Sequence, residues 1–374
     1  MTGKLIILIL CFSFLPASPV TGAAEKWVEL VERAAARGDY GAALDHLRRL
    51  EAREPDNPSL LRARTQLLKA LGGQYYRQRD FRRARETYLE ALDIEPGNFG
   101  VLRMLGEIAY FSQHLEAAAA YWNEALAIQP GDRELAGLLE RLKREAAVES
   151  GLRASSLANF DIRYTSRTGT YRIRDVESWL MEAYREIGYD FNYYPRRPVV
   201  VLLYTPEEFA RVRNTPSWVG ALYDGKIRLP VGEDLRPRDI KKILWHEYTH
   251  AVINDLTGRN CPRWLHEGLA QYQESKVDPV DLPDLARKRD RGRLIPLEEL
   301  DRAFGFDQAP ARVRLAYAQS YSLVGYLIDR YGFWRINAVL GELGKGTGWR
   351  EAFEKEFLFP VADLEEEWLG RIRP

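Results

Sequence analysis

Cysteine is scarce in this chain of 374 residues, which has only Cys11 and Cys261. Cys11 lies in an amino-terminal apolar stretch that we expect to be removed. The mature protein would then hold Cys261 alone and could form no internal disulfide. Its stability must come from packing and from any metal ion that it binds.

Net charge is also absent, since lysine plus arginine and aspartate plus glutamate each number 54. This balance gives no reason to propose nucleic acid or an anionic membrane as a partner, and we predict no nucleic-acid binding. The length exceeds that of one ordinary compact domain, so we expect at least two domains with cores of their own.

Residues 1–24 differ in composition from the rest of the chain. An apolar run, Leu5–Leu15, is followed by small residues up to Ala23 and Ala24. This pattern predicts a cleaved signal peptide and export to the periplasm or the extracellular space. The alternative is an uncleaved membrane anchor, but the run is shorter than the roughly 20 residues that span a bilayer. Membrane association is expected only if the segment stays uncleaved.

Residues 25–149 repeat a helical pattern rich in alanine and leucine. Each unit closes on a proline, at Pro55, Pro96 and Pro130. The last two prolines are 34 residues apart (130 − 96) and the first two are 41 apart (96 − 55). We expect the seven extra residues in the first helix of the second unit, near Leu60–Tyr76.

These units resemble tetratricopeptide repeats. Small alanines stand where paired helices touch, an aromatic residue follows the turn between them, and proline ends the second helix. Asp132–Glu149 supplies leucines for a helix that caps the third repeat. The concave face of such an array is a candidate docking surface for a protein or peptide, whose identity one sequence does not reveal.

A small, polar segment, Ser150–Ala158, predicts a domain boundary, and we place the second domain at 159–374. Alternating strands and helices then indicate a mixed lobe. The expected elements are a strand at Asn159–Ser166, a helix at Ile173–Ile187, a strand at Val199–Tyr204 and a helix at Pro206–Val212.

A hairpin is predicted next, because Asp224-Gly225 is a turn signal. Ile227–Val231 alternates apolar and polar residues and contains Pro230, which predicts an edge strand. An extended peptide could add to such an edge through main-chain hydrogen bonds. The alternative is a hairpin that only caps the sheet.

The strongest motif is His246-Glu247-Tyr248-Thr249-His250. Histidines four apart on a helix project from one face, so both rings reach one ion. The surrounding helix, Pro237–Leu256, has almost no polar face and should be buried, where unpaired histidines would be costly. Glu247 stands beside the first histidine, close enough to take a proton from the attacking water. A metal site therefore explains all three side chains.

Glu267 completes the expected ligand set, 17 residues after His250 (267 − 250) at the start of an apolar helix. Two histidines, one glutamate and an open position are typical of catalytic zinc, so we predict one Zn²⁺ ion. His266 points about 100° away from Glu267 on a helix and is expected to be an ordinary surface residue. Gln271 is either a partner of a ligand histidine or solvent-facing.

These residues are similar to those of the gluzincin peptidases, the thermolysin and aminopeptidase N clan, in the form of a peptidase MA-like domain. The resemblance implies an α+β thermolysin-like fold, zinc ligands at His246, His250 and Glu267, and the general base at Glu247. The segment 317–327 is similar to the one whose leading tyrosine stabilises the oxyanion. It implies that role for Tyr317, with Tyr321 as a weaker candidate and core packing as the alternative for both.

One departure concerns the segment before the catalytic helix. The aminopeptidases have a glutamate there that captures the free amine of the substrate, and this chain has Tyr223 in the run Gly220–Asp224. The resemblance therefore favours an endopeptidase acting on peptides or proteins, unless Asp224 or Glu208 replaces that carboxylate.

The sequence as a whole predicts a multidomain protein: an all-α repeat array, an α+β peptidase domain and a helical carboxy-terminal lobe. The helices of that lobe are expected at Leu297–Phe304, Tyr317–Tyr331, Phe333–Leu343, Trp349–Phe357 and Val361–Ile372. Two other functions stay open. The repeats could form a protein-binding scaffold with an inactive or structural metal domain, or the zinc site could hydrolyse something other than a peptide.

Overall fold

The computed structural model describes residues 22–55, 57–78, 80–165, 173–212, 221–232, 235–279, 285–305 and 308–372. The chain divides into two compact units between Ala146 and Ala147. Residues 1–21, which include most of the predicted signal segment, lie outside the described part.

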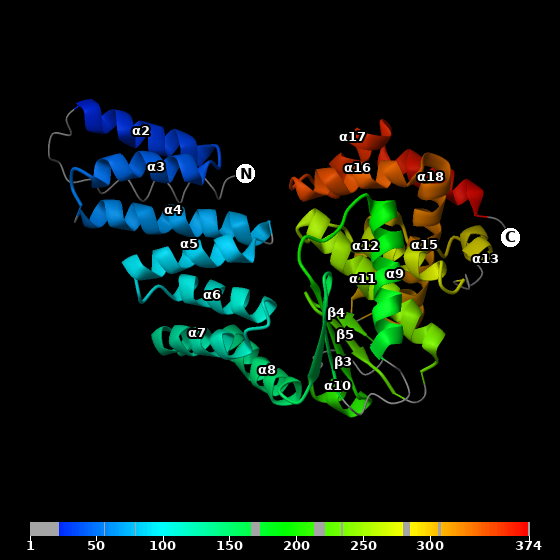
Figure 1. The fold of residues 1–374 in the computed structure, drawn as a ribbon. Coiled ribbons are helices and arrows are strands. Elements are labelled where there is room, and N and C mark those ends of the chain that lie inside the picture. The colour runs from blue at the N-terminus through cyan, green and yellow to red at the C-terminus, as the bar shows by residue number, and fades with distance from the viewer. Residues whose placement is uncertain are drawn as a thin grey trace. The chain divides into compact units, whose positions relative to one another are not determined.

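The first unit is a stack of helix pairs that follow one another in chain order (Figure 1). The elements are α2 (Gly22–Ala36), α3 (Tyr40–Glu51), α4 (Pro58–Arg77), α5 (Phe81–Ile94), α6 (Phe99–Phe111), α7 (Leu115–Ile128) and α8 (Arg133–Glu149). The part of α8 from Ala147 onward belongs to the second unit. The all-α repeat array expected from the sequence is confirmed.

The extra length of the second repeat lies in its first helix, as predicted. Helix α4 has 20 residues and the equivalent α6 has 13. Asn57 and Asn98 cap these two helices through their side-chain oxygens, and Asp39 and Asp80 cap the helices that follow α2 and α4. The same cap chemistry thus recurs at the same place in successive repeats.

Close packing within the repeats depends on pairs of glycine and an aromatic ring. A Cβ atom on Gly72 would lie 2.9 Å from the ring of Tyr88, and one on Gly106 would lie 2.2 Å from the ring of Trp122. Both members of the second pair stand 34 residues after those of the first (106 − 72 and 122 − 88). The repeat therefore includes a contact that only glycine permits.

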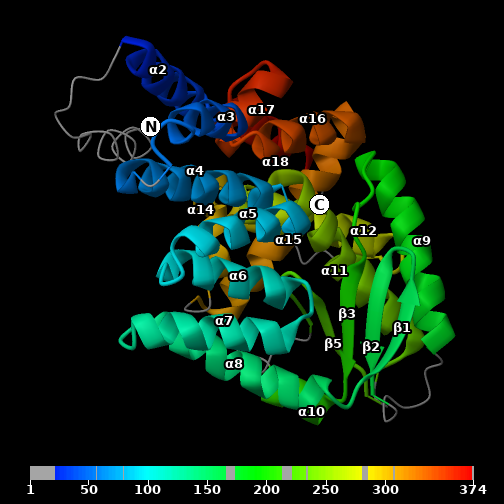
Figure 2. The ribbon, with the colours of Figure 1, turned by 60° about the vertical axis from the view of Figure 1, so that its left-hand side comes forward.

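The second unit contains a five-stranded sheet in the order β1-β2-β3-β5-β4. The strands are β1 (Arg153–Leu157), β2 (Phe160–Tyr164), β3 (Val199–Tyr204), β4 (Leu222–Tyr223) and β5 (Ile227–Pro230). Strand β3 lies between β2 and β5 and runs parallel to both (Figure 2). Strand β1 pairs antiparallel with β2, and β4 pairs antiparallel with β5. The predicted strand at Val199–Tyr204 is confirmed.

The sheet contains one strand that the sequence did not predict, and it contradicts one prediction. The boundary segment Ser150–Ala158 contains β1, which forms a hairpin with β2. Ile227–Val231 is not an edge strand, because β5 lies between β3 and β4. Pro230 is tolerated in β5 because β4 pairs with β5 only as far as Arg228. No hydrogen bond to β4 therefore requires an N–H group at residue 230.

The two faces of the sheet carry different layers. Ile162, Val201 and Leu229 belong to the main core, together with residues of α9 (Ile173–Phe191) and α11 (Pro237–Thr257). On the other face, Leu202 and Tyr204 pack with α10 (Pro206–Val212). This alternation along β3 follows from the pleat of the strand and places α11 directly over the sheet.

The remaining elements are helical, as predicted for the carboxy-terminal lobe. They are α12 (Arg263–Ser275), α13 (Leu285–Asp290), α14 (Leu297–Leu300), the 3₁₀ helix η1 (Asp301–Phe304), α15 (Pro310–Tyr331), α16 (Phe333–Gly344), α17 (Trp349–Phe357) and α18 (Val361–Arg371). Helix α13 lies where a basic loop was expected. Across the described ranges, no helix has the combined length and hydropathy that crossing a bilayer requires.

Helices α12 and α15 approach each other at Gly268. A Cβ atom there would lie 2.5 Å from the backbone oxygen of Ser320 and 2.7 Å from a methyl group of Val324. Glycine is the residue that allows this separation. The contact fixes α12, which carries Glu267, against α15, which carries Tyr317.

Candidate metal centre

Helix α11 begins and ends at defined signals. Pro237 stands in its first turn, Arg236 and Asp239 bond each other across the amino terminus, and Gly258 closes the helix with a φ of 59°. The helix interior is buried, including Tyr248, Thr249 and His250. The sequence thus produces a rigid, buried helix with two histidines one turn apart.

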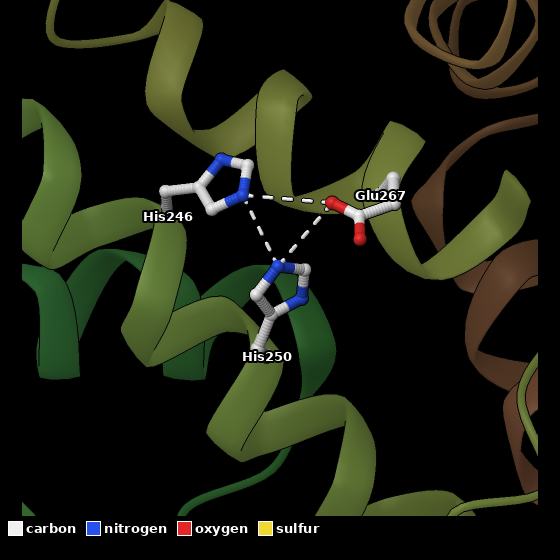
Figure 3. A group of neighbouring side chains, drawn as sticks. All are labelled: His246, His250 and Glu267. Atoms are coloured by element: carbon white, nitrogen blue, oxygen red, sulfur yellow. Dashed lines mark hydrogen bonds and ion pairs between the residues drawn. The ribbon is translucent and has the colours of Figure 1, made fainter. Parts of the chain in front are cut away.

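His246 and His250 on α11 and Glu267 on α12 point toward a common centre (Figure 3). The two histidine Nε2 atoms are 3.1 Å apart. Glu267 Oε2 lies 3.6 Å from His246 Nε2 and 3.4 Å from His250 Nε2. Their side chains are only 16%, 9% and 11% exposed, so the centre is largely shielded from bulk water.

Glu274 holds the outer nitrogen of His246. Its Oε2 lies 2.7 Å from His246 Nδ1, and its Oε1 lies 3.0 Å from Lys242 Nζ. A carboxylate accepts hydrogen bonds, so Nδ1 carries the hydrogen and Nε2 is left to face the centre. Glu274 therefore fixes both the ring orientation and the tautomer that metal binding needs.

The charges of His246 and Glu267 are coupled in this buried centre. Burial alone would lower the pKa of His246, yet hydrogen bonds to Glu267 and Glu274 and the charge of Glu247 raise it to about 10. Burial would raise the pKa of Glu267, but the charges and hydrogen bonds of His250 and His246 hold it well below its usual range. His246 and Glu267 thus favour each other's charged forms.

The donor set fits a zinc ion. Ligand atoms about 2.1 Å from one tetrahedral ion stand roughly 3.4 Å from one another, close to the three separations found here. Two imidazoles and one carboxylate are the ligands of catalytic zinc sites with three protein donors. The outer carboxylate on His246 is the support that ligand histidines commonly have.

Comparison with known families agrees with this geometry. Residues 216–373 match the model of the Peptidase MA superfamily, and residues 75–142 match a tetratricopeptide repeat model. The carboxy-terminal unit holds a peptidase MA domain. The amino-terminal unit holds tetratricopeptide repeats. No curated protein matches the chain.

Glu247 of the peptidase MA domain is buried beside the ligand histidines. Its Oε2 atom has no hydrogen-bond partner among the described residues. Burial raises the pKa of Glu247, against the opposing charges of His250 and His246. A carboxylate with a raised pKa and an uncommitted oxygen is suited to accept a proton and release it again.

Tyr317 lies near the same centre on α15. Its ring contacts Phe304 edge-on, with ring centroids 5.0 Å apart. Burial and, next, the charge of Glu267 raise the pKa of Tyr317, so its hydroxyl keeps its proton. Tyr317 is thus a hydrogen-bond donor within the electrostatic reach of Glu267 and Glu247.

His266 is not the ordinary surface residue that the sequence led us to expect. Its ring stacks on that of His250, with centroids 4.3 Å apart and planes 4° from parallel. Burial and the charge of His250 lower the pKa of His266 well below its usual range. The helix rotation does turn His266 away from the ligand group, but toward the flat face of His250.

Glu274 is the site residue that sequence reasoning missed. The sequence suggested Gln271 as a hydrogen-bond partner of a ligand histidine. Its Oε1 has no hydrogen-bond partner in the described part of the protein. Glu274 stands seven residues after Glu267, two helical turns along the same face of α12. This spacing is the feature of the sequence from which Glu274 could have been predicted.

Proposed function

We propose that the second unit is a zinc-dependent peptidase that cleaves internal peptide bonds. The observation that carries this proposal is the convergence of His246, His250 and Glu267, with Glu274 behind the first histidine and Glu247 buried beside the group. The peptidase MA match supports the same reaction class.

The residues take separate roles in the proposed reaction. His246, His250 and Glu267 would hold zinc, which when bound supplies a Lewis acid that makes peptide hydrolysis by water feasible at neutral pH. Glu247 takes the proton from the attacking water and gives it to the leaving amine. Tyr317 donates a hydrogen bond to the oxyanion that develops on the substrate carbonyl.

Internal cleavage is favoured because the candidate anchors for a substrate amine are engaged elsewhere. Tyr223 stands on β4 where the aminopeptidases have a carboxylate. Asp224 Oδ1 lies 3.3 Å from Arg228 Nε. Glu208 accepts a hydrogen bond of 2.9 Å from the backbone N–H of Thr205. These contacts support an endopeptidase over an aminopeptidase.

The central test is Glu247→Gln. We expect the variant to bind zinc like the wild type while hydrolysis falls by roughly 10²–10⁴-fold, since general acid–base catalysis is lost. Zinc-loaded wild type and variant are incubated with a denatured protein mixture, and new termini are identified by mass spectrometry. Equal cleavage by the two proteins would disprove the role of Glu247.

A second test concerns the ligands. Glu267→Ala removes one of the three protein donors, so zinc content measured by elemental analysis should fall well below one ion per chain. Glu298→Ala is a matched control, because Glu298 is an exposed glutamate paired with Arg350. Full zinc occupancy in Glu267→Ala would show that the ligand set is different.

We also propose that the repeats dock a protein substrate or partner and that the protein is exported. Removing residues 25–146 should leave cleavage of short peptides unchanged and slow the cleavage of the docked protein.

For export, amino-terminal sequencing of the mature protein should find a start after Ala23 or Ala24. An intact amino terminus would indicate the uncleaved form.

A further inference from the structure

Arg263 is a partly exposed cation beside the metal ligands. It precedes Glu267 by one turn of α12, so both side chains rise from the same face. Arg263 Nε lies 3.9 Å from Glu267 Oε1, the oxygen that does not face the histidines. That separation is too long for a hydrogen bond. The side chain of Arg263 is 45% exposed, whereas that of Glu267 is 11% exposed.

Phe304 holds the guanidinium group in place and links it to Tyr317. The Arg263 guanidinium carbon lies 5.4 Å from the centroid of the Phe304 ring. The centroid of the same ring lies 5.0 Å from the centroid of the Tyr317 ring. Burial raises the pKa of Tyr317, and the charge of Arg263 partly offsets that rise. Arg263 is thus near both Glu267 and the proposed oxyanion donor.

The neighbouring charged groups already have partners. Asp301 Oδ1 accepts a hydrogen bond of 2.9 Å from the backbone N–H of Trp264. Lys242, the other cation next to the site, pairs with Glu274 at 3.0 Å. Within the described ranges, no carboxylate oxygen lies at hydrogen-bond distance from the guanidinium of Arg263. Its planar fork of N–H donors is therefore presented to incoming molecules.

We propose that Arg263 binds a carboxylate of the substrate close to the scissile bond and thereby determines substrate class. The inference rests on the proposed peptidase function. A guanidinium group pairs with a carboxylate through two parallel hydrogen bonds, which gives both affinity and orientation. For cleavage of internal bonds, the carboxylate is that of an acidic side chain. A free carboxy terminus offers the same two oxygens, and a preference for it would instead indicate cleavage near the end of a chain.

The test uses peptides that differ only in the carboxylate. One pair carries glutamate or glutamine beside the scissile bond, and a second pair ends in a free acid or an amide. For the zinc-loaded wild type, we expect kcat/KM about tenfold higher for the acid member of one pair, as a charge-assisted hydrogen bond predicts. The pair that shows the preference identifies the source of the carboxylate.

Arg263→Leu should remove this preference, so that kcat/KM for the acid peptides falls to the level of their neutral counterparts. Arg263→Lys should keep only part of it, because an ammonium group lacks the fork geometry. Arg350→Leu is the matched control: Arg350 is 46% exposed and lies over the Trp349 ring at 5.3 Å. Loss of all activities to the same degree in Arg263→Leu would show a structural role and overturn the inference. So would the absence of any acid preference in the wild type.

A binding experiment tests this inference independently of the proposed hydrolysis. The same peptides are titrated into zinc-loaded Glu247→Gln, with and without Arg263→Leu, by calorimetry. If the wild type hydrolyses nothing, the proposed function fails, yet tighter binding of the acid peptides that depends on Arg263 still supports a carboxylate site. Equal binding of acid and neutral peptides overturns the inference whether or not hydrolysis occurs.

Discussion

Buried polar atoms without a described hydrogen-bond partner are few in the repeat unit (residues 22–146) and concentrated in the second unit, called the peptidase unit here after its peptidase MA match (residues 147–372). In the repeat unit, they include Glu51 Oε1 and Arg141 Nε on separate helices, whereas the buried Glu145 accepts a hydrogen bond of 2.7 Å from the Tyr110 hydroxyl. In the peptidase unit, helices α11 and α12 collect several buried polar atoms without a described partner. They are Trp245 Nε1, Glu247 Oε2, Tyr248 Oη, His250 Nδ1, Trp264 Nε1, His266 Nε2, Gln271 Oε1 and Gln273 Oε1. Such atoms are costly, so their concentration marks where the fold gives up stability for chemistry.

Two close glycine contacts, one in each unit, differ in what an added Cβ atom would meet. In the repeat unit, Gly106 makes room for the side chain of Trp122, whereas in the peptidase unit Gly268 makes room for the backbone of Ser320. A side chain can shift to relieve a clash, but two packed helix backbones cannot do so locally. Gly268 therefore fixes the separation of two helices that carry site residues, whereas Gly106 leaves room for one side chain.

The largest change in stability is expected at Arg228. Its side chain is 2% exposed, and its Nη1 lies 3.2 Å from Glu149 Oε1. Arg228→Met leaves the Glu149 carboxylate buried without its cation and should destabilise the peptidase unit by about 3–5 kcal/mol. Denaturant unfolding measures this change. The double variant with Glu149→Met should recover most of the loss, since both charges are then gone. No recovery would mean that the pair is not the source of the effect.

Next in size is Gly106→Ala in the repeat unit. The new methyl group must displace Trp122, whose Nε1 donates to the backbone oxygen of Arg103 at 3.1 Å. Overpacking of this kind costs about 1–3 kcal/mol. Calorimetry should show lower stability of the repeat unit with unchanged zinc affinity. A change in zinc affinity would contradict the separation of packing and chemistry between the units.

Glu274→Ala should affect zinc binding, in contrast to Gly106→Ala. Loss of the carboxylate behind His246 should weaken zinc binding by about 10–100-fold, measured by competition with a chelator. Glu274→Gln retains an oxygen that accepts from Nδ1 and should recover part of the affinity. Unchanged affinity in Glu274→Ala would remove the reason for placing Glu274 in the metal centre.

The smallest effect is expected from Gly137→Ala on α8, where an added Cβ meets nothing within 4 Å. Alanine restricts the unfolded chain more than glycine does, so the variant should gain about 0.5–1 kcal/mol. Thermal unfolding provides the measurement. Gly106→Ala and Gly137→Ala are thus the same change with opposite signs, and equal signs would mean that the Trp122 contact does not decide the outcome.

The sequence predicted the parts of this molecule that depend on local spacing. The helix around His246 and His250 and the placement of Glu267 follow from residues close together in the chain, and so does the longer α4. The position of β5 between β3 and β4 was not predictable, because strand order depends on contacts between distant segments. The stacking of His266 on His250 was missed for the same reason, since it depends on how α12 crosses α11.

The buried group formed by Arg228, Tyr204 and Glu149 also bears on where the protein can be divided. Tyr204 Oη lies 2.8 Å from Glu149 and 2.8 Å from Arg228, so the three side chains form a closed ring of contacts. Glu149 precedes the strands of the second unit, and the family match begins only at residue 216. A fragment cut at that match, or at our predicted boundary of residue 159, would lack Glu149, the buried carboxylate that pairs with Arg228. An expressible peptidase fragment should therefore begin no later than Ala147.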